Sequence, residues 1–161
     1  MISPGMRLQG RFRLKVVQDG TVREAVFADL LTRRTIVSVY MKNNTGSCDK
    51  QNDSLVAHAA EFARAGYNLV ALSRDTGGSH LRYAVKKAIP YTLASDPEDR
   101  FAQAADSIVE KSMYGKTYRG PARAAVVLDT DGTVLAVAAK VDPANHAAQV
   151  RALIAGLPPP P

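Results

Sequence analysis

Hydrophobic residues along this chain occur in short runs typical of β-strands, separated by longer segments with a helical period. Residues 11–17 alternate between apolar and polar side chains, which predicts a strand with one buried face. The turn signal Asp19-Gly20 follows, and residues 21–27 are expected to return as a strand or to form a loop. Five further segments are predicted to be strands or short extended pieces: residues 36–40, 67–72, 89–93, 124–128 and 133–138.

Four segments have the period and the end signals of α-helices. Gly66 is expected to end the first helix as its C′ residue. Ser79 is expected to cap the second, and Asp96 to cap the third, with Pro97 at its first position. The predicted helices, with the Ser79 cap included, cover residues 49–64, 79–87, 97–108 and 143–157.

The predicted elements follow the order of strands, two βα units, a β-hairpin and a final helix. The hairpin is indicated by Asp129-Thr130-Asp131-Gly132 between its two strands. Short apolar strands that alternate with helices imply an α/β fold in which helices cover both faces of a central sheet. The closing ββα unit favours a mixed sheet of thioredoxin type. We expect one domain over residues 1–157, followed by an extended, solvated proline tail at residues 158–161.

Composition and charge exclude several classes of protein. The chain is 46% hydrophobic and 22% charged, which is ordinary for a globular protein. No apolar run approaches the roughly 18 residues of a membrane span, and residues 1–13 lack the apolar core of a signal peptide, so a cytoplasmic protein without a membrane partner is expected. The net charge of +6 is not accompanied by Trp or interleaved aromatic residues, so no nucleic-acid partner is expected.

The chain has a single cysteine, Cys48, at the point where a predicted strand leads into a predicted helix. The first turn of a helix presents unpaired N–H groups and the positive end of the helix dipole, which stabilise a thiolate. The hydroxyl of Thr45, three residues earlier, can lie beside the sulfur and bond a polar substrate atom. A reactive thiolate and a buried, inert cysteine both remain open at this point.

The segment 40–48 resembles the peroxiredoxin signature Pro-x-x-x-Thr-x-x-Cys, with Met41 where proline is expected. The resemblance is closest to the Q-type peroxiredoxins, also called bacterioferritin comigratory proteins. It extends over about residues 10–155 and includes Arg123, which matches the arginine that precedes the next strand in that family. Further stretches of similar character lie at residues 72–75, 79–83, 89–96 and 110–120, the last resembling the long loop of the subfamily.

The resemblance implies a thioredoxin-like fold of peroxiredoxin type and a thiol-dependent peroxidase without a cofactor or metal. In that family the cysteine thiolate attacks a peroxide and becomes a sulfenic acid. By position, Cys48 would be the nucleophile, Thr45 would hold the peroxide oxygen, and Arg123 would stabilise the thiolate and the developing charge. The backbone N–H of Cys48 is expected to add a donor. Without the resemblance, Arg123 would be interpreted as an ordinary surface or salt-bridging arginine.

Three departures from the family pattern affect this interpretation. Met41 replaces the proline that shapes the pocket, and Asp49-Lys50-Gln51 replaces the usual Thr-Thr-Glu. We expect Asp49 to oppose the thiolate and Lys50 to favour it. Asp53 stands where many members have a resolving cysteine. The cycle would therefore use an external thiol, which could be glutathione, a thioredoxin-like protein or Cys48 of another subunit, in a monomer or homodimer.

Other function classes have weaker support. The main alternative is a non-catalytic thiol sensor or binding protein that keeps the fold without turnover. A phosphate-binding loop at residues 115–117 lacks its first glycine, and a calcium loop at residues 129–132 lacks its remaining ligands. No Gly-x-Ser-x-Gly elbow supports a serine hydrolase. The three histidines show no metal-ligand spacing: His58, His80 and His146.

Overall fold

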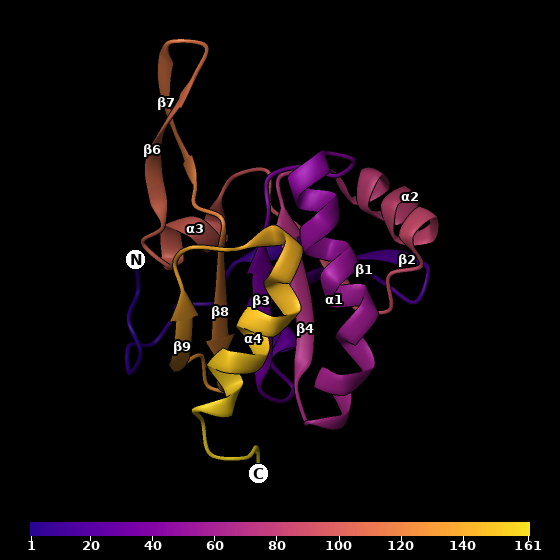
Figure 1. The fold of residues 1–161 in the computed structure, drawn as a ribbon, viewed down its shortest axis with the longest axis vertical. Helices are drawn as coiled ribbons and strands as arrows, with labels where there is room; N and C mark the ends of the chain where they lie inside the picture. Colours follow the sequence, from indigo (N-terminus) through magenta and orange to yellow (C-terminus); the bar gives the residue numbers. More distant parts are fainter.

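A seven-stranded mixed sheet forms the centre of the computed structural model, which describes all 161 residues (Figure 1). The strand order is β2-β1-β5-β4-β3-β8-β9, with β3, β4 and β5 parallel to one another and the other pairs antiparallel. Its strands are β1 Arg13–Gln18, β2 Thr21–Val26, β3 Thr35–Val39, β4 Asn68–Ser73, β5 Thr92–Ser95, β8 Ala124–Leu128 and β9 Val134–Ala138. The expected mixed α/β sheet is confirmed, and residues 21–27 form a strand over most of their length.

Helices cover both faces of this sheet. In β3 the side chains alternate between two apolar clusters, since Val37 belongs to one and Ile36 to the other. The Ile36 cluster lies under α1 and α4 (Figure 1), and the Val37 cluster lies under α3 and the N-terminal segment. The helices are α1 Gly46–Arg64, α2 Gly77–Lys87, α3 Arg100–Ala104 and α4 His146–Ala155, with 3-10 turns η1 Phe27–Leu30 and η2 Pro143–Asn145. None of them is long and apolar enough to cross a membrane.

The prediction of a third helix over residues 97–108 is wrong for most of its length, because α3 has only five residues. Asp96 still organises its start, since its carboxylate accepts the backbone N–H groups of Arg100 and Phe101 at 2.8 and 2.9 Å. Pro97 and Glu98 form a turn before it, and Asp106, in the left-handed region with φ 49°, follows its end. Two residues with the left-handed backbone, Asp99 and Asp106, therefore bracket a short helix.

The cap predicted for α2 is displaced by three residues. The N-cap is Thr76, whose hydroxyl accepts the backbone N–H of Ser79 at 3.1 Å. Ser79 lies inside the first turn rather than before it. The helix therefore begins at Gly77 and keeps the predicted end at Lys87.

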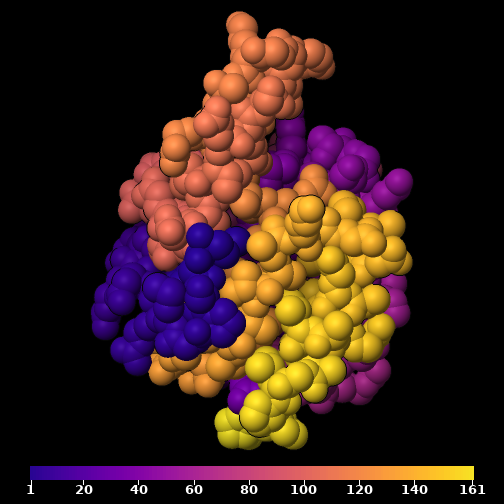
Figure 2. Space-filling view, turned by 60° about the vertical axis from the view of Figure 1, so that its left-hand side comes forward, coloured from indigo at the N-terminus to yellow at the C-terminus, as the bar shows by residue number.

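A two-stranded sheet replaces the long loop expected at residues 110–120. It consists of β6 Ile108–Met113 and β7 Lys116–Pro121, which pair antiparallel. Tyr114 and Gly115 connect them with φ values of 52° and 76°, both positive, as a type I′ turn requires. Figures 1 and 2 show this hairpin standing clear of the central sheet.

The proline tail is not free of the rest of the chain. Arg34 donates a hydrogen bond of 2.5 Å to the carbonyl of Pro158, and Pro160 lies against Gly66 so closely that a Cβ on Gly66 would be 3.2 Å from its ring. The expectation of a solvated tail is thus corrected at these two contacts. Gly66, with φ 95°, follows α1 as predicted for its end.

We predict that Leu55→Ala lowers the free energy of unfolding by about 2–5 kcal/mol, because a fully buried leucine leaves a cavity when truncated. Leu55 is 0% exposed and fixes α1 to the sheet. Val85→Ala in α2 is the control, since Val85 is 76% exposed and should change stability by no more than about 0.5 kcal/mol. Urea denaturation measures both. Equal changes in the free energy of unfolding for the two variants would show that Leu55 does not fix α1 to the sheet.

Candidate active site

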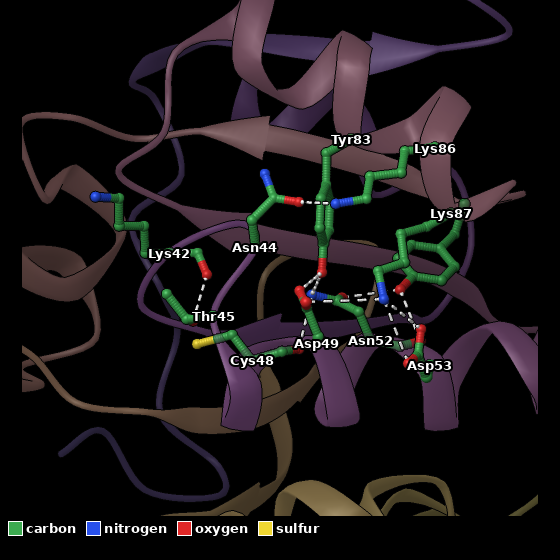
Figure 3. A network of polar contacts seen from close by, with 11 residues as sticks. Lys42, Asn44, Thr45, Cys48, Asp49, Asn52, Asp53, Tyr83, Lys86 and Lys87 are labelled. Atoms are coloured by element: carbon green, nitrogen blue, oxygen red, sulfur yellow. Dashed lines mark hydrogen bonds and ion pairs between the residues drawn. The ribbon is translucent and has the colours of Figure 1, made fainter.

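Cys48 lies in the first turn of α1, with 1% of its surface exposed (Figure 3). Two donors reach its sulfur. The backbone N–H of Met41 lies 3.4 Å from Sγ, and Nη2 of Arg123 lies 3.3 Å from it. The N–H of Cys48 itself is among those that the first turn of a helix leaves unpaired. The sulfur is therefore surrounded by hydrogen-bond donors and by one permanent cation, a setting that stabilises a thiolate.

Strand pairing explains how Arg123 reaches a cysteine 75 residues away in the sequence. β3 and β8 are antiparallel neighbours, and Val39 at the end of β3 pairs with Ala124 at the start of β8. Arg123 comes directly before that pair. It therefore lies beside the carboxyl end of β3, where the chain leaves the sheet to begin α1. The two predicted residues meet at one edge of the sheet.

Thr45 occupies the N-cap position of α1 without capping it through its side chain. Its hydroxyl donates instead to the carbonyl of Lys42 at 2.8 Å (Figure 3). Since the hydroxyl proton is used in this bond, the lone pairs of the oxygen are left to accept a hydrogen bond. A peroxide O–H is a donor of the kind that this oxygen can accept.

The carboxylate of Asp49 is held by α2. Its Oδ1 accepts the hydroxyl of Tyr83 at 2.7 Å, and Nζ of Lys87 lies 3.8 Å from Oδ2 (Figure 3). The same ammonium group lies 3.1 Å from Asp53. Lys50 is exposed. The negative charge expected to oppose the thiolate is thus paired with Lys87, and α2 and the first turns of α1 are bound together.

The sequence interpretation assigned no contact at the site to two residues that lie near the sulfur. Gln51 stands in the position of the usual Glu and is fully buried. Its Oε1 accepts a hydrogen bond of 3.2 Å from Nη1 of Arg123. Lys111 comes from β6, and its ammonium group lies 2.7 Å from Sδ of Met41. Burial, followed by repulsion from Arg74 and Arg123, lowers the pKa of Lys111. Only the folded hairpin brings Lys111 to Met41, so spacing in the sequence carried no signal for it.

A second polar network holds the loop between β3 and α1. The hydroxyl of Tyr40 donates to Oδ1 of Asn43, and the backbone N–H of Asn43 donates to Asp75 at 3.0 Å. His80 lies inside this network, with Nδ1 at 3.1 Å from the Asn43 amide and Nε2 at 3.0 Å from the carbonyl of Ala94. Burial lowers the pKa of His80 to about 4. His80 is thus a buried structural histidine, and no group of three His, Cys, Asp or Glu residues could hold a metal.

A cavity of about 650 Å³ is remote from the sulfur. It lies between the later turns of α1 and α2 and the amino ends of β4 and β5, and its lining includes none of Cys48, Thr45 and Arg123.

Comparison with known proteins identifies the family. Residues 10–137 match the AhpC/TSA family. The chain belongs to this family. Peroxiredoxin Bcp of Xanthomonas campestris is 33% identical over 119 residues, 74% of each chain. Peroxiredoxin Bcp of Escherichia coli is 30% identical over 129 residues, which cover 80% of this chain and 81% of the relative.

A similar solved structure is that of the X. campestris bacterioferritin comigratory protein, which is described for its alkyl peroxide reduction activity. The two chains superpose with a TM-score of 0.82 and are 26% identical, and the match covers 93% of this chain and 96% of that one. The resemblance to Q-type peroxiredoxins and the thioredoxin-like peroxiredoxin fold are thereby confirmed. As a peroxiredoxin the protein is a thiol peroxidase, with a peroxide as substrate and a thiol as reductant. Its single cysteine fits a one-cysteine cycle.

Met41→Pro is predicted to slow alkylation of Cys48 by iodoacetamide roughly three- to tenfold at neutral pH, because proline has no N–H to donate to the sulfur. Met41→Leu is the matched control, since it keeps the backbone donor and a similar side-chain volume. Its alkylation rate should equal that of the wild type. Equal rates in all three proteins would show that the Met41 N–H does not stabilise the thiolate.

A further prediction concerns the stability of the protein in acid. His80 is neutral when folded down to its pKa of about 4, whereas in the unfolded chain it gains a proton below its ordinary value of 6.5. Stability is therefore lost as pH falls from about 6.5 toward about 4, by about 3 kcal/mol at most. In urea denaturation between about pH 7.5 and about pH 4.5, the pH dependence should be weaker in His80→Gln. If the free energy of unfolding fell equally with pH in both proteins, the lowered pKa of His80 would be contradicted.

Proposed function

We propose that the protein reduces hydrogen peroxide or organic hydroperoxides through a sulfenic acid on Cys48, in a one-cysteine cycle completed by an external thiol. The observation that carries the proposal is the 3.3 Å contact between the Arg123 guanidinium and Sγ of Cys48 at the start of α1. A permanent cation against a lone cysteine at a helix N-terminus suits a nucleophilic thiolate.

The proposed reaction breaks the O–O bond of the peroxide. The Cys48 thiolate attacks the terminal oxygen, and a sulfur–oxygen bond forms that keeps the proton of that oxygen. The departing oxygen takes the electron pair of the O–O bond, gains a proton from solvent and leaves as water or an alcohol. Arg123 stabilises the negative charge as it moves from sulfur to that oxygen, and the free N–H of Cys48 adds a donor. Thr45 accepts the peroxide O–H, because its own proton is held by Lys42.

The substrate has to be small in the fully folded state. Cys48 is 1% exposed, and the cavity of about 650 Å³ is not lined by it. Hydrogen peroxide needs no more room than two water molecules would, whereas a bulky hydroperoxide needs the first turn of α1 to move. We therefore expect hydrogen peroxide to be the better substrate.

Reduction of the sulfenic acid needs two equivalents of an external thiol. The first forms a mixed disulfide with Cys48 and releases water, and the second exchanges with that disulfide to restore the Cys48 thiol. Glutathione, a thioredoxin-like protein and Cys48 of another subunit are the candidates. The monomer or homodimer state, the cytoplasmic location and the division into one domain, residues 1–157, with a short tail stay predictions from the sequence.

We predict that Cys48→Ser abolishes thiol-dependent peroxide consumption and that Arg123→Gln lowers kcat/KM for peroxide by a factor of about 100, as for the loss of one preorganised charge. Arg119→Gln is the matched control, because Arg119 is an exposed arginine of β7, and its activity should equal that of the wild type. Peroxide consumption is followed with glutathione and, separately, with a thioredoxin system. A wild type no faster than Cys48→Ser would overturn the peroxidase and favour a thiol sensor.

A further inference from the structure

A buried polar pathway leads away from the active site into the layer between the sheet and its helices. It starts at Arg123, which donates to Gln51, and continues from Gln51 to Ser38 in β3 and from Ser38 to His146 at the start of α4. The distances are 3.2 Å from Nη1 to Oε1, 2.8 Å from Nε2 to Oγ, and 2.9 Å from Oγ to Nε2 of the histidine. Three elements far apart in the sequence are thus connected to the guanidinium that contacts Cys48.

The three inner residues are fully excluded from water. Ser38, Gln51 and His146 are each 0% exposed, and they lie beside the apolar cluster that includes Ile36, Leu55 and other core residues. A buried polar group without a partner destabilises a protein by about 1–3 kcal/mol. Each of these groups is satisfied chiefly by the next one, so the pathway holds together only as a whole.

Chemistry fixes the direction of every bond in the pathway. Arg123 can only donate, so the Gln51 oxygen must face it and the Gln51 NH₂ group must face Ser38. The backbone N–H of Asp142 donates to Oε1 of Gln149 at 2.8 Å, and the same oxygen lies 3.3 Å from Nδ1 of His146, so Nδ1 carries the ring proton. In a neutral ring Nε2 then has a lone pair, and it accepts the hydroxyl proton of Ser38. Burial, which lowers the pKa of His146, agrees with this neutral ring.

The orientation of the Gln51 amide is the step that matters for the cysteine. If the amide were turned over, its NH₂ group would face the guanidinium and repel it. The second amide hydrogen bond, 3.2 Å to the carbonyl of Val39, favours the same orientation. The histidine, acting through Ser38, therefore helps to keep an acceptor against Arg123 and the guanidinium against Sγ of Cys48.

We propose that His146 is a positioning residue for the peroxidatic centre, acting through Ser38 and Gln51 to hold Arg123 against Cys48. The proposal deepens the proposed function and rests on it for its consequence in catalysis. Its structural part is independent of turnover, because the stabilisation of the thiolate by Arg123 can be measured without peroxide.

The test measures the rate of Cys48 alkylation by iodoacetamide across a range of pH values. His146→Leu and Ser38→Ala remove the acceptor and the hydroxyl, and each should slow alkylation at neutral pH roughly three- to tenfold and displace the rate–pH curve toward alkaline pH. His146→Gln should restore most of the rate, because its amide oxygen can accept the Ser38 hydroxyl. His58→Leu in α1 is the control, since His58 is exposed and should leave the curve unchanged.

A double variant separates positioning from loss of structure. In the Arg123→Gln background, His146→Leu should produce little further change in alkylation rate, because the group that it positions is gone. Additive losses, or failure of His146→Gln to restore the rate, would overturn the proposal and leave His146 a core residue of α4. Shifted alkylation in a protein without peroxidase activity would instead support the positioning role and contradict the proposed function.

Discussion

The pairing of β3 with β8 is the constraint on which the candidate active site depends. It aligns Val39 with Ala124, so the residue before β8 and the loop after β3 emerge at the same edge of the sheet. The arginine and the cysteine are positioned by backbone hydrogen bonds of the central sheet, and not by a flexible loop. A shift of one residue in this register would turn Arg123 to the opposite face of the sheet and remove it from the sulfur.

The sequence predicted the elements that have a strong hydrophobic period and failed where other forces decide. The strand before Cys48 and most of the long helix α1 were predicted because Ile36, Leu55 and their neighbours are apolar at the right spacing. The short α3 was not, because the Asp96 carboxylate and two left-handed residues set its limits. The hairpin carrying Lys111 is held by backbone pairing between mostly polar residues, which leaves no apolar pattern to detect.

The site residues also divide into those that the sequence indicated and those that it did not. Cys48, Thr45 and Arg123 were indicated by resemblance to a family motif, whereas spacing alone left an inert cysteine and a surface arginine open. Nothing in the sequence connects Ser38 or His146 with the cysteine, since one lies in a buried strand and the other follows a 3-10 turn. Their relation to the site exists only after α4 packs on α1, a contact that includes the 2.9 Å bond from the Ala147 N–H to Ser54.

The contacts that Asp49 and Asp53 of α1 make with Tyr83 and Lys87 of α2 have a consequence for the lifetime of the oxidised enzyme. Access of a bulky external thiol to a sulfur that is 1% exposed depends on how readily the first turn of α1 opens. That opening breaks the Tyr83–Asp49 bond and the Lys87 ion pairs. Stronger contacts between the two helices therefore prolong the lifetime of the sulfenic acid. During that time a second peroxide can oxidise it to the irreversible sulfinic acid. We therefore expect the strength of the contacts around Asp49 to influence how much peroxide the protein can meet before it is inactivated.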